Sequence, residues 1–154
     1  MEPVEYPSPF DQRVIELAES ASRYLYILSP NLDYQVFDNP DLVRALSELA
    51  RRSRQTEIRI LVSDSRGLVA RGHRLLALAR RTPSTVLIRK LEHHPEYKGQ
   101  TVIIRDRDGL LFKPAENEGF YHPDSRSDVQ PRLELFEDLW RYSSEDPELR
   151  SLSL

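Results

Sequence analysis

The chain has 154 residues, a formal net charge of -3 and no cysteine. This length suits one domain that buries a core without disulfides or a structural metal. The lack of cysteine excludes a disulfide scaffold, a thiolate nucleophile, a cysteine-based zinc site and an iron–sulfur centre. No segment approaches the roughly 18 consecutive apolar residues of a membrane-spanning helix, and residues 1–5 are acidic where a signal peptide would be basic. We therefore expect a cytoplasmic protein without membrane contacts.

The first ten residues contain three prolines, which lack a backbone donor and have a fixed φ. Residues 1–10 are therefore predicted to be a flexible leader or linker. Beyond them, apolar residues at helical spacing alternate with short branched or aromatic runs typical of strands. The helical patterns cover 11–21, 40–54 and 68–81, and the strand patterns cover 24–28, 58–62 and 85–89. Strands joined by helices of this length indicate crossover connections and a largely parallel sheet.

A hairpin is predicted at residues 100–112, where two apolar runs flank an Asp-Gly turn. A short strand at 119–123 and an amphipathic helix at 131–142 complete the pattern. These elements predict an α/β fold, a mixed, largely parallel sheet flanked by helices, in a single domain over 11–142. Residues 143–154 are expected to be a frayed C-terminal tail.

Charge is distributed unevenly along the chain. Basic side chains outnumber acidic ones only between residues 44 and 113, and acidic ones predominate in both flanking segments. Clustered Arg and Lys side chains neutralise the phosphates of nucleic acids, so this basic middle segment is compatible with a phosphate or nucleic-acid surface. Charge runs also occur on ordinary solvent-exposed helix faces, over which acidic segments can fold back. The sequence alone leaves both interpretations open.

The hairpin carries the strongest resemblance to a known family. The chain from about 11 to 142 resembles one unit of the phospholipase D-like superfamily. The resemblance rests on this hairpin, the strand and loop at 24–30, the strand at 58–64 and the helix around 136–140. In that superfamily such a hairpin bears the motif His-x-Lys-x4-Asp. The His attacks phosphorus, the Lys neutralises phosphate oxygens and the Asp orients or balances the imidazole, and two such motifs build one site. The resemblance therefore implies a phospholipase D-like fold.

The catalytic residues of that motif are missing here. When Asp106 is aligned with the Asp of the motif, Gly99 falls at the His and Thr101 at the Lys. On a strand, residues i and i+2 project from the same face, so the chemistry needs both residue types at this spacing. Gly99 supplies no nucleophile and Thr101 no charge. Asp106 alone does not make a phosphodiesterase, and an Asp is also ordinary in such a turn.

Residues near the hairpin could replace the missing groups, with His94 or His122 as the nucleophile and Lys98 as the anion binder. His94 and Lys98 have the wrong spacing for a shared strand face, and Pro95 between them interrupts any strand ladder. The adjacent side chains of His93 and His94 point apart on an extended chain, so no metal site is expected. No glycine-rich phosphate loop occurs, and no cofactor is predicted.

The first hypothesis is a catalytically inactive phospholipase D-like domain that serves as a binding, regulatory or dimerisation module. The resemblance implies a homodimer or an attached domain, and such degenerate units are similar to the accessory domains of bacterial acetyltransferases. Alternatives are a divergent phosphodiesterase or nuclease with a relocated His nucleophile, and a nucleic-acid binding module that uses the basic middle segment. The residues expected to bind an anion lie in or beside the central strands: Arg59, Arg89, Lys90, Lys98, Arg105 and Lys113.

Overall fold

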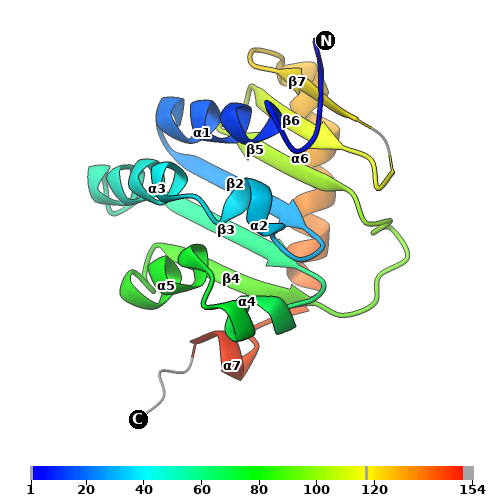
Figure 1. The fold of residues 1–154 in the computed structure, drawn as a ribbon. Helices are drawn as coiled ribbons and strands as arrows, with labels where there is room; N and C mark the ends of the chain where they lie inside the picture. The colour runs from blue at the N-terminus through cyan, green and yellow to red at the C-terminus, as the bar shows by residue number, and fades with distance from the viewer. Residues whose placement is uncertain (1, 117, 151–154) are drawn as a thin grey trace.

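The computed structural model describes residues 2–116 and 118–150, except the side chain of residue 150. Within these residues, eight strands form one sheet in the order β1-β7-β6-β5-β2-β3-β4-β8 (Figure 1). The strands are β1 (Glu2–Val4), β2 (Tyr24–Ser29), β3 (Glu57–Val62), β4 (Val86–Leu91), β5 (Thr101–Arg105), β6 (Gly109–Lys113), β7 (Gly119–His122) and β8 (Ser143–Ser144).

Parallel pairing is confined to β2, β3 and β4, and the other neighbours in the sheet run antiparallel. The predicted α/β class, with helices flanking a mixed sheet, is confirmed, but parallel strands are a minority of the sheet. Connection length gives the reason. Helices join β2 to β3 and β3 to β4, whereas short turns join β5, β6 and β7 and permit only antiparallel pairing.

Helices cover both faces of the sheet. One face carries α1, α3 and α5, and the opposite face carries α6 (Figure 1). None of the described helices has the length and apolar character needed to cross a membrane. The helices are α1 (Phe10–Ser20), α2 (Tyr34–Phe37), α3 (Pro40–Arg52), α4 (Arg66–Arg71), α5 (Arg74–Arg81), α6 (Arg126–Arg141) and α7 (Pro147–Arg150).

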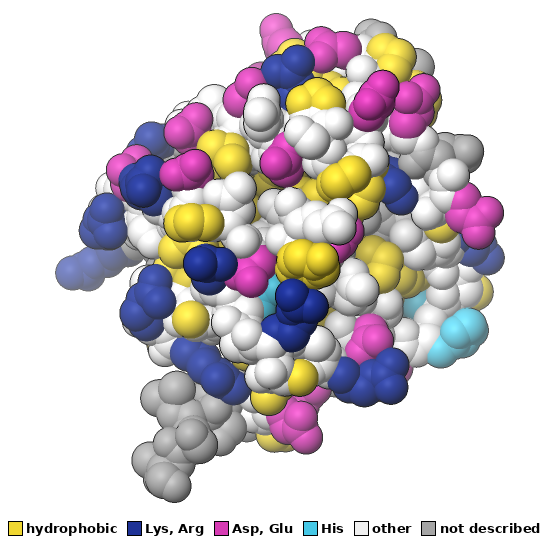
Figure 2. Space-filling model, in the orientation of Figure 1, with side chains coloured by type: hydrophobic (Ala, Val, Ile, Leu, Met, Phe, Trp, Pro, Cys, Tyr) yellow, Lys and Arg dark blue, Asp and Glu magenta, His cyan; other side chains and the backbone are white. Residues whose placement is uncertain are grey.

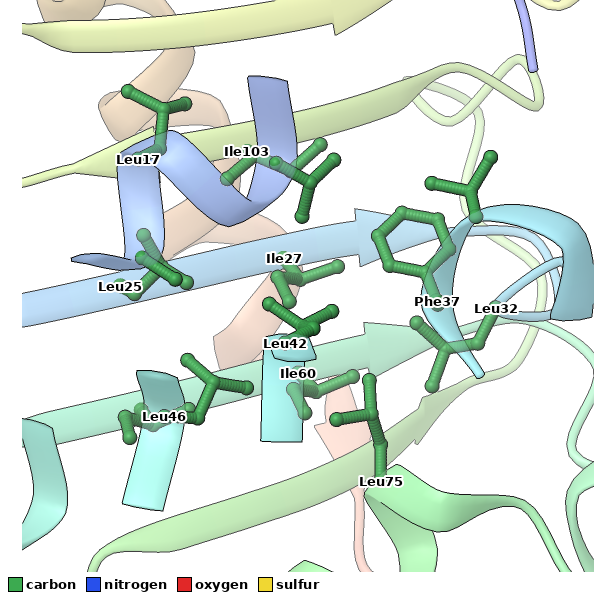
Figure 3. Close-up of a cluster of buried hydrophobic side chains, with 14 of the residues drawn as sticks. Leu17, Leu25, Ile27, Leu32, Phe37, Leu42, Leu46, Ile60, Leu75 and Ile103 are labelled. Carbon is green, nitrogen blue, oxygen red and sulfur yellow. The ribbon is translucent and has the colours of Figure 1, made fainter. Parts of the chain in front are cut away.

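The larger core lies between the sheet and α1, α3 and α5. Figure 3 shows Leu17, Leu46 and Leu75 of these helices beside Ile27 and Ile60 of the strands, and all five side chains are fully buried. Burying one such side chain contributes about 1.5–3 kcal/mol. Each helix runs back across the sheet before the next parallel strand begins, so α3 and α5 end at the edge where β3 and β4 start. We call this the amino edge of the sheet.

The helix predicted over 68–81 is two helices. Gly72 ends α4 with a φ of 65°, a left-handed conformation that glycine adopts without a steric penalty. His73 then caps α5, because its Nδ1 accepts the N–H of Leu75 at 3.0 Å and its Nε2 donates to the carbonyl oxygen of Leu32 at 3.0 Å. The buried His73 therefore has a structural role at a helix start.

The first and last described segments, residues 2–10 and 143–150, join the fold more than the sequence predicted. Residues 1–10 were expected to form a leader, but β1 pairs with β7, and Val4 and Phe10 are buried. Proline is tolerated there because β1 is an edge strand. In the predicted frayed tail, β8 pairs with β4 and Leu149 of α7 is buried. Residues 151–154 lie outside the described residues.

Candidate nucleic-acid interface

The hairpin of β5 and β6 separates the residues aligned with the phospholipase D motif. Thr101 starts β5 at the edge of the sheet where β2 and β3 end, and Asp106 follows β5 at the amino edge. The strand between them spans about 17 Å at roughly 3.4 Å per residue. Thr101 is only 6% exposed. Asp106 is therefore too distant to act on a group bound beside Thr101 or Gly99.

Asp106 is bonded into a turn. Its φ is 52°, and its carboxylate accepts the backbone N–H groups of Ser22, Arg23 and Tyr24 at 3.0, 2.9 and 3.1 Å. Its own N–H donates to the carbonyl oxygen of Tyr24 at 3.1 Å. These bonds fix the turn between β5 and β6 to the start of β2. Asp tolerates positive φ better than most residues, which suits it to this turn.

The two histidines considered as replacement nucleophiles lie near opposite ends of α6. His122 Nδ1 is 3.1 Å from the carboxylate of Asp128 in the first turn, and His94 Nε2 is 3.8 Å from that of Asp138 in the last turns. Asp138 lies ten positions after Asp128 along the helix, or about 15 Å at 1.5 Å per residue. Lys98 is exposed in the loop between β4 and β5. The structure therefore does not bring His94, His122 and Lys98 together in one site.

The six basic residues expected to bind an anion are dispersed over the fold, and five of them already have contacts within it. Ion pairs with nearby carboxylates hold Arg59, Lys90 and Arg105. Two others, Arg89 and Lys113, lie over aromatic rings. Five of the six cations predicted from their sequence positions to bind an anion therefore already have a partner within the fold.

A different set of basic side chains gathers at the amino edge. Figure 2 shows Lys and Arg side chains along the left margin of the molecule, where Figure 1 places the ends of α3 and α5. Five exposed arginines define the set, which we call the amino-edge arginines: Arg23, Arg51, Arg54, Arg107 and Arg126. Among the described residues, none of the five forms an ion pair with Asp or Glu.

These arginines line two adjoining hollows. The Tyr24 hollow has a volume of about 630 Å³ and is lined by Ser22, Arg23, Tyr24, Gln55, Glu57, Asp106, Arg107, Asp108 and Arg126. The Ser84 hollow has a volume of about 650 Å³ and is lined by Ala50, Arg51, Arg52, Ser53, Arg54, Ser84 and Thr85. Consecutive residues, Arg54 and Gln55, belong to the two hollows, which therefore form one continuous surface.

The acidic side chains of the Tyr24 hollow are engaged with other partners. Asp106 holds three backbone N–H groups, Asp108 pairs with Arg105 at 2.9 Å and Glu57 pairs with Arg59 at 2.9 Å. No carboxylate is among the residues that line the Ser84 hollow. The amino edge therefore carries a local excess of positive charge on a chain whose net charge is -3. Guanidinium groups bind phosphate oxygens in a bidentate manner.

The sequence gives only a partial signal for this surface. Arg51, Arg52 and Arg54 lie at the end of α3, where cations also complement the carbonyl end of the helix dipole. Such a run does not by itself indicate a ligand. Arg107 and Arg126 belong to segments distant from it, and the pairing of β5 with β2 brings the hairpin turn to the same edge. The complete set therefore emerges only from the folded chain.

Solved structures with the same architecture define the class of the fold. Nuc from Salmonella typhimurium, a phospholipase D family member, has a TM-score of 0.65 and 19% identity, over 90% of this chain and 93% of its own. NucT from Helicobacter pylori has a TM-score of 0.65 and 14% identity, over 94% of this chain and 98% of its own. TrmBL2, an archaeal chromatin protein described with a novel mode of DNA binding, has a TM-score of 0.66 and 14% identity. That match covers 94% of this chain but about half, 53%, of TrmBL2.

The fold is thus phospholipase D-like, as the hairpin predicted. The chain belongs to the family DUF7931, a domain of unknown function, whose model matches residues 6–152. No curated protein sequence matches the chain significantly.

Proposed function

We propose that this domain is a non-catalytic phospholipase D-like module that binds the phosphate backbone of nucleic acids through the amino-edge arginines. The observation that carries the proposal is the set of five exposed arginines, which line two adjoining hollows without carboxylate partners among the described residues. Clustered guanidinium groups gain free energy by releasing the counterions condensed on the phosphates.

The residues at the motif positions support the non-catalytic part of the proposal. Gly99 and Thr101 stand where a phosphodiesterase needs its His and Lys, and Asp106 is bonded into the turn. His94 and His122 lie beside carboxylates near opposite ends of α6, at 3.8 and 3.1 Å. A function in binding needs none of these groups.

The comparisons supply analogy for the same proposal. Nuc and NucT share the phospholipase D-like fold, and TrmBL2 combines a similar fold with DNA binding. Because the identities lie between 14% and 19%, the analogy concerns architecture alone. The proposal that this chain binds nucleic acid therefore rests on its own arginines.

Fluorescence anisotropy of a labelled oligonucleotide tests the proposal. In about 50 mM salt, the double variants Arg51→Gln/Arg54→Gln and Arg107→Gln/Arg126→Gln should each weaken binding at least about tenfold, because each removes two phosphate contacts. The matched control is Arg44→Gln/Arg71→Gln, which removes the same charge from exposed arginines of α3 and α4.

Equal losses in the control and test variants would refute a localised binding surface. Absence of nucleic-acid binding by the unaltered domain at this salt concentration would refute the function itself. Hydrolysis of a generic phosphodiester substrate, bis(p-nitrophenyl) phosphate, tests the non-catalytic part. Turnover that is lost in His94→Ala or in His122→Ala would contradict it.

A further inference from the structure

Four aromatic side chains form a row on the face of the sheet that carries α6. Tyr24 stacks on Tyr26 with ring centroids 4.6 Å apart, and Tyr26 stacks on Phe136 at 4.8 Å. Trp140 continues the row beyond Phe136 at 5.8 Å. The angles between successive ring planes are 23°, 11° and 19°, so the rings are close to parallel.

The row ends at the amino-edge surface. Trp140 and Tyr26 are buried at 7% and 4% exposure, and their faces also carry the guanidinium of Arg59. Tyr24 is less buried and lines the Tyr24 hollow. Among the described residues, Tyr26 is the one aromatic partner of Tyr24, and no cationic side chain lies over the Tyr24 ring. Tyr24 therefore contributes part of its surface to the wall of a hollow rimmed by arginines.

The backbone position of Tyr24 relative to Arg23 and Arg107 is fixed by the turn. The Asp106 carboxylate holds the N–H groups of both Arg23 and Tyr24, and the Asp106 N–H is bonded to the Tyr24 carbonyl. Arg107 follows Asp106 directly in the same turn. The backbone that carries Tyr24, Arg23 and Arg107 is thus fixed before any ligand binds, which lowers the entropic cost of binding.

We infer that the ligand of the amino edge is single-stranded nucleic acid, with one unpaired base stacked on Tyr24 and the adjacent phosphates bound by Arg23, Arg107 and Arg126. This inference rests on the function proposed above and specifies its substrate class. An unpaired base presents its face to an aromatic ring, whereas a base within a duplex is covered on both faces by its neighbours. The Gln55 side chain in the same hollow offers an amide donor and acceptor to the edge of that base.

Binding of four 15-nucleotide ligands tests this inference: a DNA thymidine strand, an RNA uridine strand, a DNA strand of abasic sites and a DNA duplex. The abasic strand keeps the phosphates and removes the bases, so it separates stacking from charge. We expect at least about tenfold tighter binding of one of the base-bearing single strands than of the abasic strand and the duplex, since stacking of one base is typically worth about 1–3 kcal/mol. The DNA and RNA arms show whether the 2′-hydroxyl contributes.

Two variants of Tyr24 complete the test. Tyr24→Leu removes the aromatic face and keeps an apolar contact with Tyr26, whereas Tyr24→Phe keeps the ring. The leucine variant should lose the preference for base-bearing strands and retain the salt-dependent affinity for the abasic strand, and the phenylalanine variant should bind as the unaltered domain does. The fluorescence of a 2-aminopurine base in the DNA strand should be quenched when the strand binds the unaltered domain. Binding to Tyr24→Leu should not quench it.

The outcomes separate this inference from the proposed function. Equal affinity for all four ligands, or no effect of Tyr24→Leu, would overturn base stacking and leave backbone binding by the arginines intact. Failure of every ligand to bind would overturn the proposed function as well. Retained quenching in Tyr24→Leu would also contradict the assignment of Tyr24 as the stacking residue.

Discussion

Replacement of Asp106 by alanine tests whether this residue is a structural clamp of the turn at the amino edge. The substitution removes an acceptor for three backbone N–H groups, those of Ser22, Arg23 and Tyr24. It also places a residue less tolerant of positive φ at a backbone φ of 52°.

The expected loss of stability follows from these two effects. The three charge-assisted bonds are partly exposed, so each contributes about 0.5–1 kcal/mol after exchange with water. The left-handed conformation costs alanine about 1 kcal/mol. Together they predict that the free energy of unfolding falls by about 3 kcal/mol. With a urea m-value of about 2 kcal/mol/M, the midpoint falls by about 1.5 M.

Urea unfolding followed by circular dichroism measures this shift. Asp106→Asn keeps one carbonyl acceptor and the tolerance for positive φ, so its loss should be about half that of alanine. Asp124→Ala is the control, because Asp124 is an exposed aspartate in the loop before α6. A midpoint for Asp106→Ala within about 0.2 M of the control would refute the structural role.

Two further predictions concern the start of α5. Burial lowers the pKa of His73 below its usual value of about 6.5, so below that pH the unfolded chain takes up the proton first. The free energy of unfolding should therefore fall as the pH drops from 7 to 5. His73→Asn keeps a capping side chain and should reduce this fall. Equal pH dependence of the unfolding free energy in both proteins would contradict the assignment of this effect to His73. Gly72→Ala should destabilise the domain by about 1 kcal/mol because Gly72 has a φ of 65°, and an unchanged urea midpoint would show that the backbone relaxes instead.

The sequence predicted the central elements of the fold well because their apolar patterns are strong. Residues 24–28 of β2, including Leu25 and Ile27, form an apolar and aromatic run, since the strand is buried on both faces. The split between α4 and α5 was not predicted, because Leu68, Leu75 and Leu76 keep a helical spacing on either side of Gly72. Apolar spacing reports which face is buried and does not report a break in the helix axis.

Elements held by few contacts were predicted least well. The edge strands β1 and β8 are three and two residues long, too short for an alternating pattern to stand out. The helix α6 begins at Arg126, five residues before the predicted start, because Ser125 caps it. Pro131, the predicted start of the helix, lies within it. Charge and apolarity in the sequence gave no indication of this cap.

The candidate site illustrates a different limit. The sequence predicted anion-binding cations on or beside the strands of its basic middle segment, and most of these cations form ion pairs or ring contacts within the fold. Arg23 and Arg126 lie outside that segment altogether. Which cations remain unpaired depends on tertiary contacts, and the sequence alone does not contain these explicitly.

The salt dependence of nucleic-acid affinity tests the central proposal most directly. If all five amino-edge arginines contact phosphates of a single strand, the plot of log K against log salt concentration should have a slope of about -3.5. In Arg107→Gln/Arg126→Gln the slope should become shallower by about 1.4, and in Arg44→Gln/Arg71→Gln it should not change. A slope near zero, or equal slopes in the unaltered domain and the Arg107→Gln/Arg126→Gln variant, would contradict phosphate binding at the amino edge.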